Sequence, residues 1–276
     1  MKPVKNIHQE FEPPEELSDI IKCFWYNDTD FGEKETSFEV IPDGYAEIIF
    51  HFGIGCSISD QGNLLKLPSP FLVGLLNQPI HFHTKGRLQI LAVRCFPWVV
   101  FDLLGLTSNK NGVHIFEHPI AGLQSTLNKL LDQCKTEEAI NHIKAYFLNI
   151  RSQIPSDSML YKAGIAMRKA NGAIPVHQIA DAAHSTVRTL ERKFKQSSGH
   201  TVKDVASLMR FEQVRNRLWS YPTTHLAELA VELGYADQAH LSKEFKKYTG
   251  TTPSSFARKA KKEQIPDHDF VVFVQS

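Results

Sequence analysis

The C-terminal part of the chain contains one short pattern twice, and this repeat limits the fold more than any other feature. The matching positions, 50 or 51 residues apart, are Ile179-Ala180 with Leu229-Ala230, Leu190 with Leu241, Phe194 with Phe245, and Gly199 with Gly250. Each copy predicts a short helix, a sharp turn and a second helix, with Thr186 and Asp237 as N-caps of the second helices. This pattern is typical of a helix-turn-helix unit, whose second helix enters the major groove of DNA.

A single helix is predicted between the two copies, over residues 202–219. Its apolar stripe consists of Val205, Leu208, Phe211, Val214 and Leu218. A helix of this length spans about 26 Å, and the major groove of B-DNA returns to the same face about every 34 Å. We therefore expect one chain to present two recognition helices to neighbouring turns of DNA without dimerisation.

The charge of the chain is unevenly distributed, although its formal net charge is only +1. Residues 156–262 contain 18 Lys and Arg against 9 Asp and Glu, so the remaining residues carry a net negative charge. This division indicates a basic module with a polyanionic partner beside a separate acidic module. The alternative is that the basic residues are simply solvated side chains on helix surfaces and bind no partner.

The first half of the chain predicts mainly β-structure. Short β-rich segments at 38–52, 71–75, 80–83 and 88–96 are separated by turn sequences such as Pro42-Asp43-Gly44 and Asp60–Asn63. Two amphipathic helices are expected between Ile120 and Ile150. The predicted organisation is α+β: a β-rich domain with a helical pair over 1–155, an all-α domain of two helix-turn-helix units over 156–262, and a tail over 263–276.

Two segments at the edges of these predicted domains are less regular. Residues 153–157 have the composition of a linker followed by a helix start. In the tail, residues 270–274 (Phe-Val-Val-Phe-Val) are strand-like and can pack against the first domain, with disorder as the alternative.

Cysteine use and hydropathy indicate the compartment. Four cysteines (Cys23, Cys56, Cys95 and Cys134) are widely spaced and form no C-x-x-C pair, which favours reduced, mostly buried thiols over a zinc site or a redox sensor. No apolar run approaches the roughly 18 residues of a membrane helix, and the N-terminus lacks the apolar core of a signal peptide. We expect a cytoplasmic protein with no membrane contact.

The C-terminal part contains a set of specific motifs, which are Arg188–Lys195, Gly199, Arg210-Phe211, Leu226–Leu229, Gly234–Gln238, His240–Ser242, Phe245–Gly250 and Pro253. Together they resemble the DNA-binding domain of the AraC/XylS family of transcriptional regulators. One departure is His184, which stands where many relatives have a glycine in the turn, and this puts the first turn in question. The resemblance implies a sequence-specific regulator of transcription that binds double-stranded DNA, with RNA polymerase as a further partner.

The resemblance also implies which residues contact DNA. Base contacts fall on Arg188, Glu191 and Arg192 in the first recognition helix and on Gln238, Ala239, His240, Ser242 and Lys243 in the second. Phosphate contacts are expected from Lys193, Lys195, Lys246, Lys247, Arg258 and Lys259, for each of which a solvated side chain is the alternative. Arginine can donate two hydrogen bonds to guanine, and glutamate can accept one from the amino group of cytosine. We therefore expect the first recognition helix to discriminate between DNA sequences more strongly than the second.

The N-terminal part resembles, less specifically, an uncharacterised domain that precedes this module in some bacterial regulators. The matching residues are Phe24–Tyr26, Ile41–Gly44, Ile48–Phe50, Val73-Gly74 and Val93–Trp98. In the wider family the first domain is often a cupin-like barrel that binds a small-molecule effector or mediates homodimerisation. Candidate lining residues for an effector pocket are Trp25, Tyr26, Asp43, Glu47, Arg94 and Trp98, although such aromatic residues are more often plain core.

No cofactor, metal or catalytic site is expected. His81 and His83 lie on one face of a predicted strand with His51 elsewhere, but the carboxylate that usually completes a cupin metal site is missing. None of the common catalytic motifs is present. Two alternatives to an effector-responsive regulator stay open: a DNA-repair or other enzyme that uses the helix-turn-helix units for targeting, and an architectural DNA binder without effector.

Overall fold

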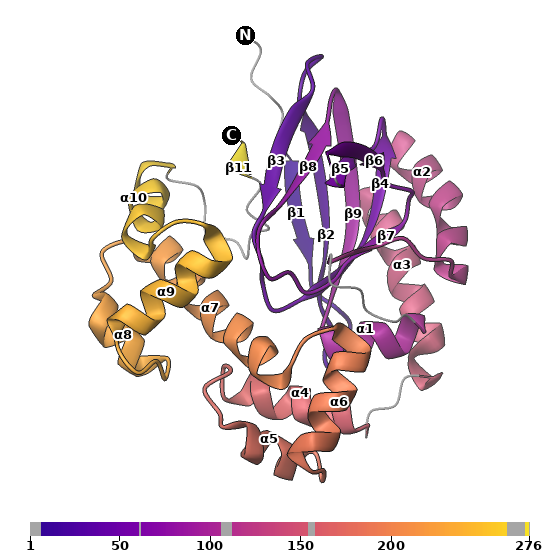
Figure 1. Cartoon of the computed structure of the whole chain (residues 1–276). Coiled ribbons are helices and arrows are strands. Elements are labelled where there is room, and N and C mark those ends of the chain that lie inside the picture. The colour runs from indigo at the N-terminus through magenta and orange to yellow at the C-terminus, as the bar shows by residue number, and fades with distance from the viewer. Residues whose placement is uncertain (1–6, 61, 106–111, 154–157, 264–273, 276) are drawn as a thin grey trace.

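A computed structural model of the chain describes residues 7–60, 62–105, 112–153, 158–263 and 274–275. Two antiparallel β-sheets form the N-terminal part and a series of helices forms the C-terminal part, as the sequence predicts (Figure 1). None of the helices in the described residues is long and apolar enough to cross a membrane.

The first sheet contains six strands in the order β1-β2-β9-β4-β7-β10. Its strands are β1 (Ile7–Phe11), β2 (Ile21–Asp30), β4 (Ala46–Gly53), β7 (Phe71–Val73), β9 (Arg87–Cys95) and β10 (Val113–His114). The second sheet contains five strands in the order β11-β3-β8-β5-β6. They are β3 (Thr36–Val40), β5 (Ser57–Asp60), β6 (Asn63–Lys66), β8 (Ile80–Thr84) and β11 (Val274–Gln275).

Side chains that alternate along the strands separate two cores. In β2, Trp25 faces the space between the two sheets, while Phe24 and Tyr26 face the outer side of the first sheet. Helices cover that outer side, and the ring of Phe24 lies 6.3 Å from that of Phe147 in α3. The covering helices are α1 (Pro97–Leu104), α2 (Gln124–Asp132) and α3 (Thr136–Ile150). Three short 3₁₀ turns accompany them at Glu15–Leu17, Pro119–Leu123 and Arg151–Gln153.

Two of the predicted turns are present, with different consequences. The turn at 60–63 closes a hairpin, because Asp60 pairs with Asn63 across β5 and β6. The turn that contains Asp43 joins β3 to β4, but these strands lie in different sheets, so the chain crosses from one sheet to the other there. The predicted β-rich structure is thus arranged as two sheets that pack against each other.

The C-terminal helices follow the predicted repeat. They are α4 (Met159–Lys169), α5 (Val176–Ala182), α6 (Val187–Ser198), α7 (Val202–Ser220), α8 (Leu226–Glu232), α9 (Gln238–Thr249) and α10 (Pro253–Glu263). The two short helices α5 and α8 each have 7 residues, and the second helices α6 and α9 each have 12. The predicted connecting helix over 202–219 is α7, which begins and ends within one residue of the prediction.

The N-terminal part packs against the first helix-turn-helix unit and α7. Helix α1 contacts α4 and α6, and Trp98 of α1 lies directly against Gly164 of α4. The turn between β3 and β4 touches α7, where Gly44 faces Met209 and Glu212. Helices α8–α10 lie at the far end of α7, away from the first sheet (Figure 1).

The predicted packing of the C-terminal tail against the first domain can be compared with the structure only at residues 274–275. In the described part, Val274 pairs with Glu39 of β3, which agrees with packing of the tail against the first domain. Residues 270–273 and most of the predicted linker, 154–157, lie outside the described residues.

Candidate nucleic-acid interface

Each recognition helix begins at a side-chain cap, as predicted. The hydroxyl of Thr186 accepts a hydrogen bond from the backbone N–H of Thr189 at 3.2 Å. In the second unit, a carboxylate oxygen of Asp237 accepts from the N–H of His240 at 2.7 Å. Such caps satisfy amides that the first helical turn leaves unpaired, so they set the residue at which each recognition helix starts.

The two turns have the same backbone geometry despite their different residues. Gly234 has a φ of +73°, and His184, 50 positions earlier, has a φ of +50°. Both values lie in the left-handed region, which costs an ordinary residue about 1–2 kcal/mol and glycine almost nothing. The first turn is therefore formed with histidine in the position that favours glycine.

The apolar face of each recognition helix is buried as expected. Leu190 and Phe194 in α6, and Leu241, Phe245 and Tyr248 in α9, are each at most 1% exposed. In the second unit the ring of Phe211, from α7, lies 5.3 Å from that of Phe245 and 5.0 Å from that of Tyr248. Packing on α7 thus fixes which face of α9 looks outward.

The outward face of α6 carries two arginines. Arg188 and Arg192 are exposed, whereas Glu191 is half-buried and accepts a hydrogen bond from the N–H of Val202 at 3.3 Å. Glu191 therefore already helps to hold the start of α7, and contact with a base would require it to release that amide. Of the three residues predicted to reach bases from α6, the two arginines are the ones presented to solvent.

The five residues of α9 that are predicted to contact bases are mainly polar, and one of them is a lysine. Gln238, Ala239, His240 and Lys243 are exposed, and Ser242 is half-buried. The ring of His240 packs edge-on against Tyr235, with centroids 5.4 Å apart. All six residues predicted to contact phosphate are exposed: Lys193, Lys195, Lys246, Lys247, Arg258 and Lys259.

Arg210 joins the two units across α7. It donates from Nη1 to the backbone oxygen of Gly172, in the loop before α5, at 2.9 Å. Its Nη2 lies 3.8 Å from Oε2 of Glu244 in α9, and its guanidinium lies over the ring of Tyr235. Tyr235 donates to Glu244 at 2.9 Å, and burial together with that carboxylate raises the pKa of Tyr235. The Arg210-Phe211 and Gly234-Tyr235 motifs are therefore structural, and they fix the spacing of the recognition helices.

The six residues predicted to line an effector pocket do not line one common pocket. Trp25 and Glu47 face the space between the sheets, where the indole N–H donates to Glu47 at 3.3 Å. Tyr26 faces the opposite side of the same strand, and Trp98 is buried against α4. The void beside Trp25 and Glu47 measures about 20 Å³, enough for about one water molecule. Adjacent strand residues point to opposite faces, so the predicted set could not share one pocket.

Asp43 and Arg94, the other two residues of that set, form an ion cluster with Glu47. Arg94, 1% exposed, pairs with Asp43, and its Nε lies 3.6 Å from Oε1 of Glu47. Burial raises the pKa of Glu47 to about 7, against the opposing effect of Arg94. The cluster lies beside the turn that touches Glu212 of α7, so it connects the inter-sheet core to the helical part.

The histidines and cysteines have ordinary structural surroundings. His81 lies 3.8 Å from Glu39 and His83 lies 3.9 Å from Glu35, while Nε2 of His51 lies 3.0 Å from the backbone oxygen of Pro68. No group of three potential metal ligands occurs within the described residues. Cys23, Cys56 and Cys95 are buried free thiols whose pKa values are raised by burial, and Cys134 is an exposed free thiol.

Each of the two parts of the chain matches a known family model. Residues 179–259 match the family model of a helix-turn-helix domain, and residues 9–111 match a domain of unknown function, DUF6597. The uncharacterized transcriptional regulatory protein YesN of Bacillus subtilis (strain 168) is 35% identical over 71 residues, which cover 25% of this chain and 19% of that protein. The chain thus matches only about a fifth of the length of that curated relative.

Solved structures are similar at low sequence identity. ToxT from Vibrio cholerae is 10% identical with a TM-score of 0.49, over 85% of this chain and 98% of that chain. The C-terminal domain of AraT, a response regulator from Geobacillus stearothermophilus, is 24% identical with a TM-score of 0.30, over 34% of this chain and 84% of that chain. With the matched family model, the described helices confirm the expected helix-turn-helix region behind a β-rich domain of unknown function.

Proposed function

We propose that the chain is a sequence-specific, DNA-binding transcriptional regulator. In this proposal residues 156–262 bind DNA, residues 1–155 sense a small-molecule effector, and residues 263–276 form a tail. The observation that supports it is the pair of helix-turn-helix units with second helices of equal length, 12 residues each, whose outward faces are polar and basic. A single 19-residue helix joins the units and spans about 28 Å, which suits recognition of two neighbouring major grooves.

The two recognition helices have different roles in this proposal. Arg188 and Arg192 on α6 each have the donor geometry that pairs with the O6 and N7 atoms of guanine. On α9, Gln238 can pair with adenine, Ala239 can contact a thymine methyl, and Lys243 is a single donor. We therefore assign most of the sequence discrimination to α6 and more of the phosphate binding to α9.

Electrostatic attraction supports binding without specifying a sequence. Residues 156–262 carry twice as many basic as acidic side chains, 18 against 9. Neutralising phosphates releases counterions, so affinity falls steeply as the salt concentration rises. Each lysine that contacts a phosphate contributes about 0.9 to the slope of log affinity against log salt.

Effector binding in the first domain would act by favouring one arrangement of that domain on α7 over another. Homodimerisation through the first domain, contact with RNA polymerase and a cytoplasmic location complete the proposed role.

An enzymatic role in alkylation repair needs a reactive thiolate. Three of the four cysteines are buried with raised pKa values, which keeps them protonated and argues against that role.

Selection of bound sequences from a random DNA pool tests the proposal. The full chain should enrich two short half-motifs separated by about one helical turn, about 10 base pairs. The same selection with Arg192→Ala should lose discrimination at one or two positions of one half-motif, with affinity for the best site lower by about 1–3 kcal/mol.

Lys195→Ala is the matched control, because Lys195 lies on the same helix and is also exposed. It should lower affinity for all sequences alike and reduce the salt slope by about 1, while the selected motif stays the same. Enrichment of no motif by the unmodified chain would refute the proposal. Equal loss of sequence preference in both variants would refute the division between base and phosphate contacts.

A further inference from the structure

A cleft opens between the two sheets on the side where neither sheet continues. The first sheet ends at β10 and the second at β6, and no strand of the described residues joins these two edges. The cleft has a volume of about 720 Å³ and is formed by the β5–β6 hairpin, the start of β8, β10 and the segment before β8. Pockets for drug-sized ligands range over about 300–1,000 Å³, so this cleft has a suitable size.

The floor of the cleft is continuous with the inter-sheet core. Leu67, Leu76 and Val113 belong to that core and are 2%, 5% and 7% exposed. The rim carries Leu65 and Ile115, which are 41% and 56% exposed and leave apolar surface in contact with water. An apolar molecule in the cleft would cover the rim residues and gain about 25 cal/mol for each Å² of apolar surface removed from water.

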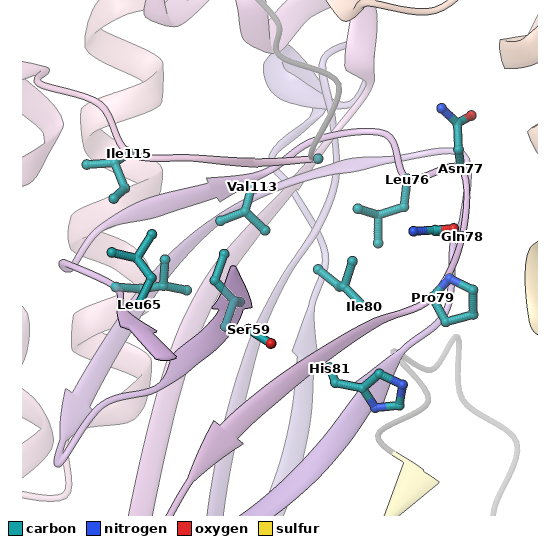
Figure 2. A pocket seen from close by; sticks show the side chains of 13 residues that line it. Ser59, Leu65, Leu76, Asn77, Gln78, Pro79, Ile80, His81, Val113 and Ile115 are labelled. Carbon is teal, nitrogen blue, oxygen red and sulfur yellow. The ribbon is translucent and has the colours of Figure 1, made fainter. Parts of the chain in front are cut away.

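The cleft is lined by four polar side chains. They belong to Ser59, Asn77, Gln78 and His81, and no Asp, Glu, Lys or Arg is among the described lining residues. Figure 2 shows the amide of Gln78 directed towards Leu76 and Ile80, whereas Asn77 points away from them. A charged ligand group would lose hydration here without gaining an opposite charge from the described lining residues, which is unfavourable. An uncharged polar group can instead pair with an amide or hydroxyl.

We propose that this cleft binds an uncharged, mainly apolar small molecule that carries a hydrogen-bonding group. Its role as the effector site rests on the proposed regulatory function, but the binding itself does not. The site replaces the interior residues expected from the sequence, because the void beside Trp25 and Glu47 holds about 20 Å³ and the cleft about 720 Å³.

The cleft also has a short structural connection to α7. Ile80 lines it and pairs with Val40 of β3. Val40 directly precedes the turn whose Gly44 lies against Glu212 and Met209. A ligand that displaces the start of β8 therefore acts on the strand that leads into the contact with the connecting helix.

Two fluorescent probes with one ring system test the proposal on the full chain. N-phenyl-1-naphthylamine is uncharged, and 8-anilinonaphthalene-1-sulfonate adds a negative charge to the same rings. We expect the uncharged probe to bind saturably with one molecule per chain, and the sulfonate to bind at least tenfold more weakly.

Adjacent leucines of β6 provide a matched pair of variants. Leu65 lines the cleft and Leu64 does not, and the two are 41% and 51% exposed, so replacement of either by lysine should leave the fold intact. Leu65→Lys should weaken binding of the uncharged probe at least tenfold, while Leu64→Lys should change it less than twofold. Circular dichroism of both variants checks the fold.

The opposite results overturn the proposal in distinct ways. Equal effects of the two substitutions, or none, would place the probe elsewhere. Equal affinity for both probes would refute the preference for an uncharged ligand. Loss of a dimer in Leu65→Lys on sedimentation, with probe binding unchanged, would make the cleft a subunit contact. Because the assay contains no DNA, its failure is distinguishable from failure of the DNA selection.

Discussion

Substitution of Gly164 by alanine should destabilise the protein, although the same change in most helices is stabilising. Gly164 lies inside α4, and a glycine-to-alanine change within a helix gains about 1 kcal/mol from backbone propensity. Here a Cβ atom would lie 2.5 Å from Nε1 of Trp98 and closer still to two ring carbons. Non-bonded carbon atoms prefer separations of about 3.5–4.0 Å, and these two ring carbons would lie closer than 2.5 Å, so α4 or the indole must move by more than about 1 Å.

The surroundings of Trp98 leave little space for this movement. The ring of Trp98 is 2% exposed and stacks on Phe96, with centroids 5.3 Å apart and planes 12° apart. The guanidinium of Arg168 covers Phe96 at 4.2 Å. Overpacking a well-filled core costs about 1–3 kcal/mol, which exceeds the propensity gain at the upper end of that range. We expect a net loss of up to about 2 kcal/mol in the free energy of unfolding.

Urea denaturation followed by far-ultraviolet circular dichroism measures this loss. Gly122→Ala is the control, because Gly122 lies in a short 3₁₀ turn and no neighbouring atom lies within 4 Å of the place that the added methyl group would take. The control should change the free energy of unfolding by less than about 0.5 kcal/mol. A Gly164→Ala variant at least as stable as the unmodified chain would show that α4 does not rest on Trp98, and the described contact between the two parts would be wrong.

Three further substitutions test other features, each by urea denaturation. His184→Gly should raise the free energy of unfolding by about 0.5–1 kcal/mol, because the φ of +50° costs histidine more than glycine; a decrease would contradict the left-handed turn. Burial raises the pKa of Glu47 from its usual 4.5 to about 7, so the fold favours the protonated form and loses stability as pH rises through that interval. Glu47→Gln removes this loss, and its stability relative to the unmodified chain should increase between pH 5 and pH 8; a constant difference would refute the shift. Arg210→Ala removes a partner from both Glu244 and the backbone oxygen of Gly172 and should cost about 2–3 kcal/mol, whereas Arg217→Ala breaks an exposed pair and should cost less than about 1 kcal/mol. Equal costs would remove the special role of Arg210.

The helical part was predictable because its signals are local. Apolar spacing located α5 to α9, and capping residues such as Thr186 and Asp237 located the starts of the recognition helices within one residue. The resemblance added which faces meet DNA, and the exposure of Arg188 and Arg192 agrees with it. Glu191 differs, because its contact with the N–H of Val202 joins residues that a pattern along one helix does not relate.

The β-rich part was less predictable because strand pairing depends on distant residues. The turn after Val40 was identified from Pro42-Asp43-Gly44, but nothing in that sequence tells whether the flanking strands pair with each other or enter different sheets. Helix α1 was missed, because Pro97–Leu104 is apolar on nearly all sides and has no amphipathic period.

The cleft between the sheets was not predicted from the sequence for a similar reason. Trp25, Glu47 and Arg94 stand out in the sequence as aromatic and charged residues in strands, but they satisfy one another inside the sandwich. The cleft is lined by ordinary residues such as Leu65 and Gln78, and its existence follows from where the two sheets end. Sequence patterns do not show where a sheet stops relative to its neighbour.

The crossing between sheets at residues 41–45 has a mechanical consequence. Because β3 belongs to one sheet and β4 to the other, this short turn is attached to both and rests on α7 through Gly44. A shear of one sheet across the other changes the position of the turn and therefore the force on the middle of α7. Helix α7 runs from α6, which contacts α1, to α9 at its far end, so a shear of the sheets would bear on α7 between the two recognition helices.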